Sequence, residues 1–240
     1  DPIRVSEQIV IELSHISKTF NMGKSNAFEA LKGIDLSIHM GGMTVFKGPS
    51  GSGKTTLLSI IGCMSRATSG RIMVNNRETT SLPERFAAGV RRKTFGFIFQ
   101  DYQLIRGITA LENVMIPAYP TGRKHAVVKK KAGDLLGRLH MASKAHEKVE
   151  NLSGGERQRV AISRALINDP SVIIADEPTA HLDTEMSGKF MALMAGFRAE
   201  GKTILIASHD PLVSGYHGVD RVLGLRDGEK IGRASCRERV

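Results

Sequence analysis

A glycine-rich stretch at residues 48–56 has the residue types and spacing of a triphosphate-binding loop. It reads Gly-Pro-Ser-Gly-Ser-Gly-Lys-Thr-Thr and matches the pattern G-x-x-x-x-G-K-[ST]. Glycines let successive backbone N–H groups converge on an anion, and a following helix directs its positive end to the same point. The predicted nucleotide-binding residues are therefore Gly48, Pro49, Ser50, Gly51, Ser52, Gly53, Lys54, Thr55 and Thr56.

Two side chains of this loop extend the prediction from a phosphate to a metal-bound nucleotide. Lys54 adds a full charge that can reach the β- and γ-phosphates, and the Thr55 hydroxyl is placed to coordinate Mg²⁺. Residues 43–47 before the loop are predicted to form a buried strand, and residues 57–61 after it a helix. This strand–loop–helix context argues against a glycine-rich turn that matches the pattern by chance.

Two adjacent acids, Asp176 and Glu177, follow the apolar run at residues 172–175. Such a run is typical of a parallel strand buried on both faces. Neighbouring residues at a strand end point in different directions, so one carboxylate can face a metal while the next faces the attacking water. We assign Asp176 to the Mg²⁺ shell and Glu177 to the general base. The alternative, two acids in a solvated turn, is weakened by the phosphate loop earlier in the chain.

Two further polar residues, Gln100 and His209, follow the predicted strands at residues 95–99 and 203–207. A side-chain amide can bridge Mg²⁺ or the attacking water, and an imidazole can hydrogen-bond the γ-phosphate. Taken alone, each is more often an ordinary polar residue at a strand end. Because they share the predicted sheet edge with Asp176, Gln100 joins the predicted metal set and His209 the predicted catalytic set.

The stretch at residues 152–156, Leu-Ser-Gly-Gly-Glu, predicts a helix start with an anion-binding end. Ser153 and Glu156 have the spacing of a capping box. Two glycines at a helix start lower its stability unless something must approach the backbone closely. A phosphate supplies that reason, because a bare helix N-terminus binds anions. Ser153, Gly154, Gly155 and Glu156 are therefore predicted to form a second phosphate-binding element, here called the signature stretch.

Taken in order, these motifs make the chain resemble the ATP-binding subunit of ABC transporters. The resemblance covers the phosphate loop, Gln100, the signature stretch, residues 172–177, residues 180–183 and His209. It implies an α/β fold: a P-loop NTPase core with a mostly parallel sheet, an antiparallel β subdomain and a helical signature subdomain. It also implies an ATPase with ATP and Mg²⁺ as cofactors.

The resemblance assigns further roles. Phe20 resembles the aromatic residue that stacks on adenine, with Phe28 as a rival in the same loop. The signature stretch is expected to contact the γ-phosphate on a second copy of the chain, and Asp183 to lie in the loop that links the two sites across the dimer. Residues 101–119 are expected to face integral membrane permease subunits, with the chain at the cytoplasmic face of the cell membrane.

Within the family, the chain is most similar to subunits of lipoprotein-releasing and macrolide-exporting systems. Residues 96–105, 109–114 and 155–161, with the long loop between Phe20 and Leu31, carry this similarity. Residues 180–183 depart from it, because they read Ala-His-Leu-Asp where that group usually has Gly-Asn-Leu-Asp.

The composition sets the remaining bounds. The 240 residues carry a formal net charge of +10 and two cysteines, which fits a reducing compartment and no disulfide framework. No apolar run is long enough to span a membrane, and no signal peptide is expected. Residues 121–148 hold eight Lys or Arg against two Asp or Glu. This charge favours a solvated helix face, so no nucleic acid partner is expected; the alternative is a soluble ABC-type ATPase acting on nucleic acid or the ribosome.

The elements that must position these residues are expected in one domain. We predict strands at residues 9–13, 31–38 and 71–74, helices at residues 109–115 and 184–198, and a closing hairpin at residues 221–231. The expected domain covers residues 1–231, with a helical subdomain at about 101–168. Residues 232–240 match no apolar period and are expected to be a non-native or disordered tail.

Overall fold

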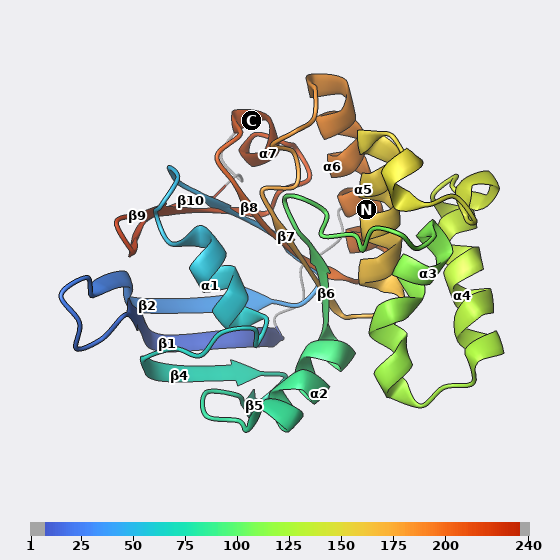
Figure 1. Ribbon diagram of the computed structural model, residues 1–240. Helices are drawn as coiled ribbons and strands as arrows, with labels where there is room; N and C mark the ends of the chain where they lie inside the picture. Colours follow the sequence, from blue (N-terminus) through green and yellow to red (C-terminus); the bar gives the residue numbers. More distant parts are fainter. Residues whose placement is uncertain (1–7, 236–240) are drawn as a thin grey trace.

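The computed structural model describes residues 8–235 and is centred on a six-stranded sheet (Figure 1). The strand order is β10-β9-β3-β8-β7-β6. All neighbouring strands are parallel except β9 and β10, which form an antiparallel hairpin. The strands are β3 (Met43–Lys47), β6 (Phe95–Ile98), β7 (Val172–Asp176), β8 (Thr203–Ser208), β9 (Arg221–Arg226) and β10 (Glu229–Ser235).

A second, antiparallel sheet has the order β2-β1-β4-β5. Its strands are β1 (Ile9–Phe20), β2 (Phe28–His39), β4 (Ser69–Val74) and β5 (Arg77–Glu78). The first strand is longer than the predicted residues 9–13, because register shifts against β2 let it continue through a polar segment. Asn75 and Asn76, with φ of 48° and 59°, form the left-handed turn between β4 and β5.

Helices surround the two sheets. They are α1 (Lys54–Ile61), α2 (Glu84–Thr94), α3 (Ala110–Met115), α4 (His125–Arg138), α5 (Gly154–Leu166), α6 (Thr184–Ala199) and α7 (Pro211–Ser214), with the 3₁₀ turns η1 (Ile116–Thr121), η2 (Ala142–Lys144) and η3 (Val149–Asn151). In Figure 1, α3, α4 and α5 lie together on one side of the parallel sheet, away from α1 and the antiparallel sheet. No helix within residues 8–235 has the length and apolar character needed to cross a membrane.

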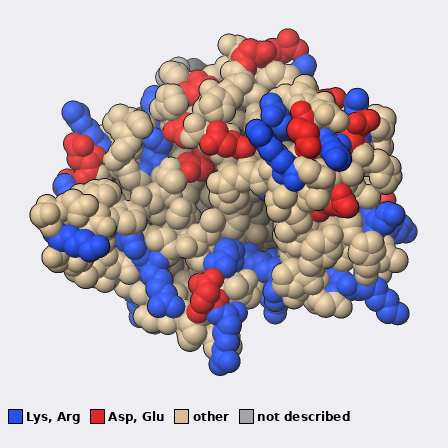
Figure 2. All heavy atoms as spheres, in the orientation of Figure 1, with Lys and Arg blue, Asp and Glu red and all other residues tan. Residues whose placement is uncertain are grey.

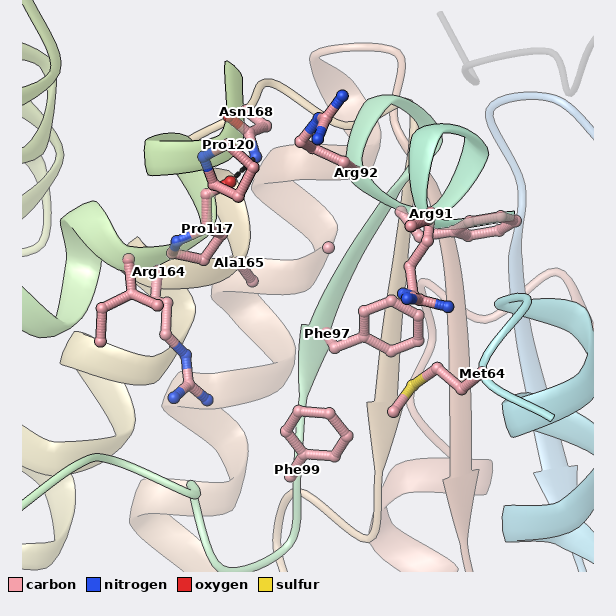
Figure 3. Close-up of a pocket in the computed structure, with 14 residues that line it drawn as sticks. Met64, Arg91, Arg92, Phe97, Phe99, Pro117, Pro120, Arg164, Ala165 and Asn168 are labelled. Atoms are coloured by element: carbon pink, nitrogen blue, oxygen red, sulfur yellow. Dashed lines mark hydrogen bonds between the residues drawn. The ribbon is translucent and has the colours of Figure 1, made fainter. Parts of the chain in front are cut away.

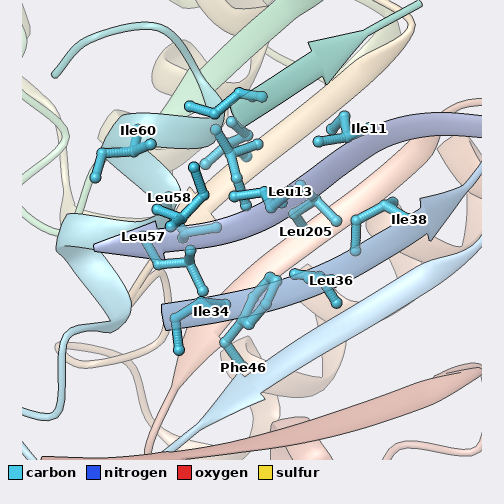
Figure 4. Packing of buried hydrophobic residues seen from close by; sticks show 14 of the residues in the cluster. Ile11, Leu13, Ile34, Leu36, Ile38, Phe46, Leu57, Leu58, Ile60 and Leu205 are labelled. Atoms are coloured by element: carbon cyan, nitrogen blue, oxygen red, sulfur yellow. The ribbon is translucent and has the colours of Figure 1, made fainter. Parts of the chain in front are cut away.

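The parallel sheet is buried on both faces, as the continuous apolar runs predict. Along β3, Phe46 packs with α1 and the antiparallel sheet, whereas Val45 packs with α5 and α6 on the opposite face. Figure 4 shows the first of these clusters, where Phe46 and Leu205 meet residues of β1, β2 and α1. A third cluster joins α3, α4 and α5. The α/β fold with an antiparallel sheet and a helical region is confirmed.

One boundary differs from the prediction. The closing strand was expected to stop at Ile231, but β10 continues to Ser235 and pairs with β9 as far as Arg221. Backbone pairing with β9 does not need an apolar period in the sequence, which is why the pattern missed it. The rest of the expected tail, residues 236–240, lies outside the described residues.

Candidate functional site

The candidate site lies where four neighbouring parallel strands end. The phosphate loop follows β3, His209 follows β8, Glu177 follows β7, and Gln100 lies two residues beyond β6. Because β8 pairs with both β3 and β7, the strand order brings these segments to one sheet edge. Ligands of open α/β sheets bind at this carboxyl edge.

The backbone of the phosphate loop is shaped by glycine. Gly51 and Gly53 have φ of 79° and 99°, in the left-handed region, and Gly53 is the N-cap of α1. A Cβ on Gly53 would lie 2.7 Å from the carbonyl oxygen of Ala30, so the position admits no side chain without a shift. The hydroxyl of Ser52 is buried and has no hydrogen-bond partner. An orphaned donor beside a helix N-terminus fits a phosphate ligand.

Lys54 is 5% exposed and points into the loop that it follows. Its Nζ donates to the carbonyl oxygens of Gly48 at 2.8 Å and Pro49 at 3.0 Å, and lies 3.3 Å from Oε1 of Glu177. The ammonium is therefore held at the loop and paired with the proposed base.

Thr55, Gln100 and Asp176, the predicted metal set, line one cavity of about 360 Å³. The Thr55 hydroxyl donates to Oδ1 of Asp176 at 3.1 Å. Burial raises the pKa of the Asp176 carboxyl, an effect that the Thr55 hydrogen bond partly offsets and the nearby Glu177 charge adds to. Hydroxyl, amide and carboxylate oxygens suit Mg²⁺. Among the described residues, no group of three or more His, Cys, Asp or Glu could hold a metal ion.

Glu177 occupies a strained position between two cationic or proton-donating groups. Its φ is 45°, and its backbone N–H donates to the carbonyl oxygen of Ala207 at 2.9 Å. Its side chain is 13% exposed, with Oε1 near Lys54 and Oε2 2.9 Å from Nδ1 of His209. An ionised carboxylate can only accept, so with Glu177 ionised the Nδ1–H of His209 is the donor. Asp176 and Glu177 thus contact different partners.

The two candidate aromatic residues lie together. Phe20 and Phe28 are paired across β1 and β2, and their rings stack with centroids 5.3 Å apart and an interplanar angle of 22°. The Nζ of Lys18 lies 5.0 Å from the Phe20 ring centroid. Phe28 is 57% exposed. The rivals thus form one aromatic surface, with Phe28 as its open part.

The signature stretch begins α5, and its predicted capping box is confirmed. The Ser153 hydroxyl accepts from the Glu156 N–H at 3.3 Å, and Glu156 Oε2 accepts from the Ser153 N–H at 2.8 Å. This second bond lowers the pKa of the Glu156 carboxyl. A Cβ on Gly154 would meet nothing within 4 Å, whereas a Cβ on Gly155 would lie 2.6 Å from Cε of Met186.

The signature stretch and the phosphate loop do not meet within one chain. In Figure 1 the start of α5 lies across the sheet from α1. Within residues 8–235, none of the hydrogen bonds or ion pairs found joins residues 152–156 to residues 48–56. Asp183 caps α6 by accepting from the Met186 N–H at 2.8 Å.

Sequence reasoning missed two side chains that tie α5 to the site. Gln158 donates to the carbonyl oxygen of Pro178 at 2.9 Å, just beyond Glu177. Arg164 donates to the carbonyl oxygens of Tyr102 and Gln103, just beyond Gln100. Their position on the helix that follows the signature stretch was the only available signal, because backbone carbonyls leave no trace in a sequence.

A groove of about 470 Å³ opens beside Gln100 (Figure 3). Phe97, Phe99 and Met64 line one side, and Pro117, Pro120 and Arg164 line the other. The dashed line in the figure is the hydrogen bond from the Asn168 amide to the carbonyl oxygen of Pro117, at 2.8 Å. The walls are largely apolar, and Ile116 and Pro117 belong to the segment predicted to face a membrane partner.

Comparison with known proteins gives consistent matches. A family model described as ABC transporter matches residues 31–180. The macrolide export ATP-binding/permease protein MacB from Hyphomonas neptunium is 40% identical over 222 residues, 92% of this chain and 34% of that protein. MacB from Bartonella henselae is 42% identical over 222 residues, 92% of this chain and 33% of that protein. The chain thus spans about a third of the length of these relatives.

Solved structures agree with the sequence relatives. The dimeric ATP-binding cassette MJ0796, in a post-hydrolysis state bound to ADP and Pi, superposes with a TM-score of 0.86 at 36% identity, covering 95% of this chain and 100% of that one. A second dimeric structure of the same bacterial ABC transporter cassette gives a TM-score of 0.87 at 38% identity, with the same coverage.

Proposed function

The chain belongs to the ABC transporter family and is an ATPase cassette that binds ATP and ADP, and from this premise we propose that two copies of it close head to tail around two ATP molecules. Support comes from the separation of the phosphate loop and the signature stretch, since neither can complete the other's site within one chain. The structural relatives are dimers. The N-terminal end of α5, with Ser153, Gly154 and Gly155, supplies donors for the γ-phosphate of the partner's nucleotide.

One observation carries the proposed chemistry: the Glu177 carboxylate lies between Lys54 and His209, beside the Thr55–Asp176 pair. When ATP binds, the Lys54 ammonium would leave the carbonyl oxygens of the loop and contact phosphate oxygens instead. Glu177 would then be free to orient and deprotonate the attacking water. His209, fixed by its Nδ1–H donation, presents Nε2 to the γ-phosphate. Mg²⁺, held by Thr55, Gln100 and Asp176, supplies charge neutralisation at the β- and γ-phosphates.

We propose that the energy of this cycle drives an integral membrane permease. Two curated relatives are named macrolide export ATP-binding/permease proteins. The part matched here is about a third of their length, so the unmatched part is about twice as long as the matched part. The apolar groove beside residues 116–120 is suited to receive a short permease helix. The cassette is then peripheral, at the cytoplasmic face of the membrane, and powers macrolide, peptide or lipid export or lipoprotein release.

The domain organisation is part of this proposal. We take the expected domain, extended from residue 231 to the end of β10 at Ser235, as one ATP-binding domain with a helical subdomain at about 101–168. The separate cluster that joins α3, α4 and α5 supports a helical unit able to shift against the sheet. ATP closure and hydrolysis are to bias that shift as a two-state switch.

The surface charge gives no specific support to a nucleic acid partner. Figure 2 shows Lys and Arg interspersed with Asp and Glu over the visible face, with no continuous basic stripe on it. The basic segment at residues 125–138 forms α4, whose buried residues Val128, Ala132 and Leu136 occupy one side. Its lysines are then a solvated face of an amphipathic helix.

The test of the proposed chemistry is Glu177→Gln. The amide keeps the shape and an acceptor for His209, but it cannot take a proton. We expect ATP binding and ATP-dependent dimerisation to persist while hydrolysis falls at least about 100-fold, measured by phosphate release and by size-exclusion chromatography with ATP. Glu185→Gln is the matched control, because Glu185 pairs with Lys189 on the exposed side of α6. ATP hydrolysis at the parent rate in Glu177→Gln would show that Glu177 is not the general base.

The permease proposal is tested by recovery of the tagged chain from detergent-solubilised host membranes. Co-recovery of a membrane protein with an extracytoplasmic domain is expected. Recovery of ribosomes, DNA or soluble chains alone would contradict the transport proposal.

A further inference from the structure

The loop that carries Gln100 has an unfavourable backbone conformation. Tyr102 and Gln103 have φ of 58° and 47°, so two consecutive non-glycine residues are left-handed. Side chains other than Asn, Asp and Gly rarely adopt this region, and strain of this kind persists only where surrounding groups impose it. Within the loop, the Tyr102 N–H donates to Phe99 O at 3.0 Å and the Gln103 N–H to Asp101 O at 2.6 Å. Something outside the loop must hold the two carbonyl groups.

That group is the Arg164 guanidinium. NH1 donates to the carbonyl oxygen of Gln103 and NH2 to that of Tyr102, both at 2.6 Å. The planar fork of arginine matches two adjacent acceptors, which a lysine ammonium cannot do with the same geometry. Burial lowers the pKa of Arg164, and its hydrogen bonds go to carbonyl oxygens instead of a carboxylate. The Arg164 guanidinium is partly buried, yet it contacts two backbone carbonyl groups and forms no ion pair through them. Its contribution is therefore to fix the conformation of the loop.

Arg164 is also one of three tethers on α5 and the segment just after it, where Asn168 follows the helix end at Leu166. Gln158 holds the segment after Glu177, and Asn168 holds Pro117 at the groove. Arg164 lies between them on α5 and lines the same groove as Asn168 (Figure 3). Hydrogen bonds thus connect α5, which starts at the signature stretch, to the loop that carries Gln100.

We propose that Arg164 is a positioning residue, which holds residues 100–103 so that Gln100 faces Thr55 and Asp176 and which makes this placement follow the position of α5. The proposal rests on the proposed function for the metal role of Gln100. It identifies a link between the groove and the site that neither the phosphate loop nor the signature stretch contains.

The experiment uses Arg164→Met, which keeps the long apolar stem and removes both donors. Hydrogen exchange is measured for the amides of residues 99–104 and 51–57, without nucleotide. We expect faster exchange at residues 99–104 and no change at residues 51–57. Arg164→Lys should give an intermediate rate, and Arg85→Met, on the exposed end of α2, should change neither segment. Unchanged exchange at residues 99–104 in Arg164→Met would overturn the proposal.

The functional readout is the Mg²⁺ concentration that gives half-maximal ATPase activity. Loss of a group that orients a metal ligand typically costs about 10-fold or more in metal affinity or activity. We expect a rise of that size in Arg164→Met and in Gln100→Ala, and no further rise in the double variant, because Arg164 acts through Gln100. Additive effects in the double variant would contradict the proposal.

The two readouts separate this proposal from the proposed function. If Gln100→Ala leaves the Mg²⁺ dependence unchanged, the metal role of Gln100 is wrong, and the exchange rates alone decide whether Arg164 holds the loop. If Gln100→Ala shifts the Mg²⁺ dependence and Arg164→Met does not, the metal role stands and the positioning role fails.

Discussion

At the residue scale, Asp176 is a carboxyl group in an environment that disfavours its charge. Burial raises its pKa, and Thr55 offsets only part of that effect. The folded chain therefore binds a proton more tightly than the unfolded chain, and stability falls as pH rises from the unfolded to the folded pKa. At pH values above the folded pKa, the full loss of stability from the ionised Asp176 carboxylate remains. The ionised Asp176 carboxylate therefore lowers the stability of the fold, but the proposed metal site needs an ionised ligand at this position.

Asp176→Asn is therefore expected to be more stable than the parent chain at about pH 7, without nucleotide, and to lose that advantage towards about pH 4. Asn keeps an acceptor for Thr55 but carries no charge. Urea unfolding at both pH values measures the effect, with Asp134→Asn on the exposed side of α4 as the control. Mg²⁺-dependent ATPase activity should be lost in the same variant. A less stable Asp176→Asn chain at neutral pH would contradict this account of the carboxyl group.

Phe28 gives a second prediction at this scale. Because the Phe28 ring is exposed and stacks on one face of the Phe20 ring, we expect adenine to stack on Phe28, with Phe20 as the ring that supports it. Phe28→Ala should weaken ATP binding by about 1–3 kcal/mol, the usual range for loss of a base–aromatic stack. Titration with a fluorescent ATP analogue measures this. Phe86→Ala, an exposed phenylalanine on α2, is the control; equal affinities in the two variants would exclude Phe28 from the base site.

At the element scale, α3 and α5 start with the same capping box, Thr109 with Glu112 and Ser153 with Glu156. The pair offers a matched comparison. Thr109→Ala and Ser153→Ala should each lower the free energy of unfolding by about 1 kcal/mol. Only Ser153→Ala should also weaken ATP-dependent dimerisation, since only α5 directs its N-terminus to a partner's phosphate in the proposed dimer. Calorimetry and light scattering with ATP measure the two effects, and equal dimerisation of the variants would argue against the signature role.

Elements with a strong local signal could be predicted from the sequence. The strand at Met43–Lys47 and the capping box of Ser153 with Glu156 were found because apolar runs and cap residues are local features. The helix α2 was missed, because its N-cap is Pro83 without a side-chain cap and only Ala87 and Thr94 are buried. The second half of β1 was missed because residues 14–19 are mostly polar and include His15 with φ of 52°.

At the scale of the whole molecule, Phe46 joins the two sheets. Its ring is 1% exposed in the cluster between β3, α1 and the antiparallel sheet (Figure 4). Phe46→Ala should destabilise the chain by about 3–5 kcal/mol through lost burial and a residual cavity. Denaturant unfolding measures this, and Phe86→Ala on the surface serves as the reference. A loss below about 1 kcal/mol would mean that the two sheets do not depend on this contact.

The order of the strands in the sheet could not be predicted from the sequence. An apolar run indicates burial on both faces but not which strand lies beside it. That Asp176, Glu177, Gln100 and His209 lie at strand ends was predictable, since each comes within two residues of the end of such a run. The Glu177–Lys54 and Glu177–His209 contacts depend on β8 lying between β3 and β7. The Arg164 tether depends on a loop conformation that no residue type in the loop reveals.

The position of β3 in the sheet has a consequence for how the chain is made. This strand precedes the phosphate loop, yet its two neighbours are β8 and β9, which lie more than 150 residues later in the chain. During synthesis from the N-terminus, Val45 and Phe46 of β3 have no strand partners at first. Their partners, β8 and β9, leave the ribosome only near the end of synthesis of this domain. Such long-range pairing slows folding and exposes an aggregation-prone edge. The nascent cassette therefore needs protection on the ribosome, and its nucleotide site forms only at the end of translation of this domain.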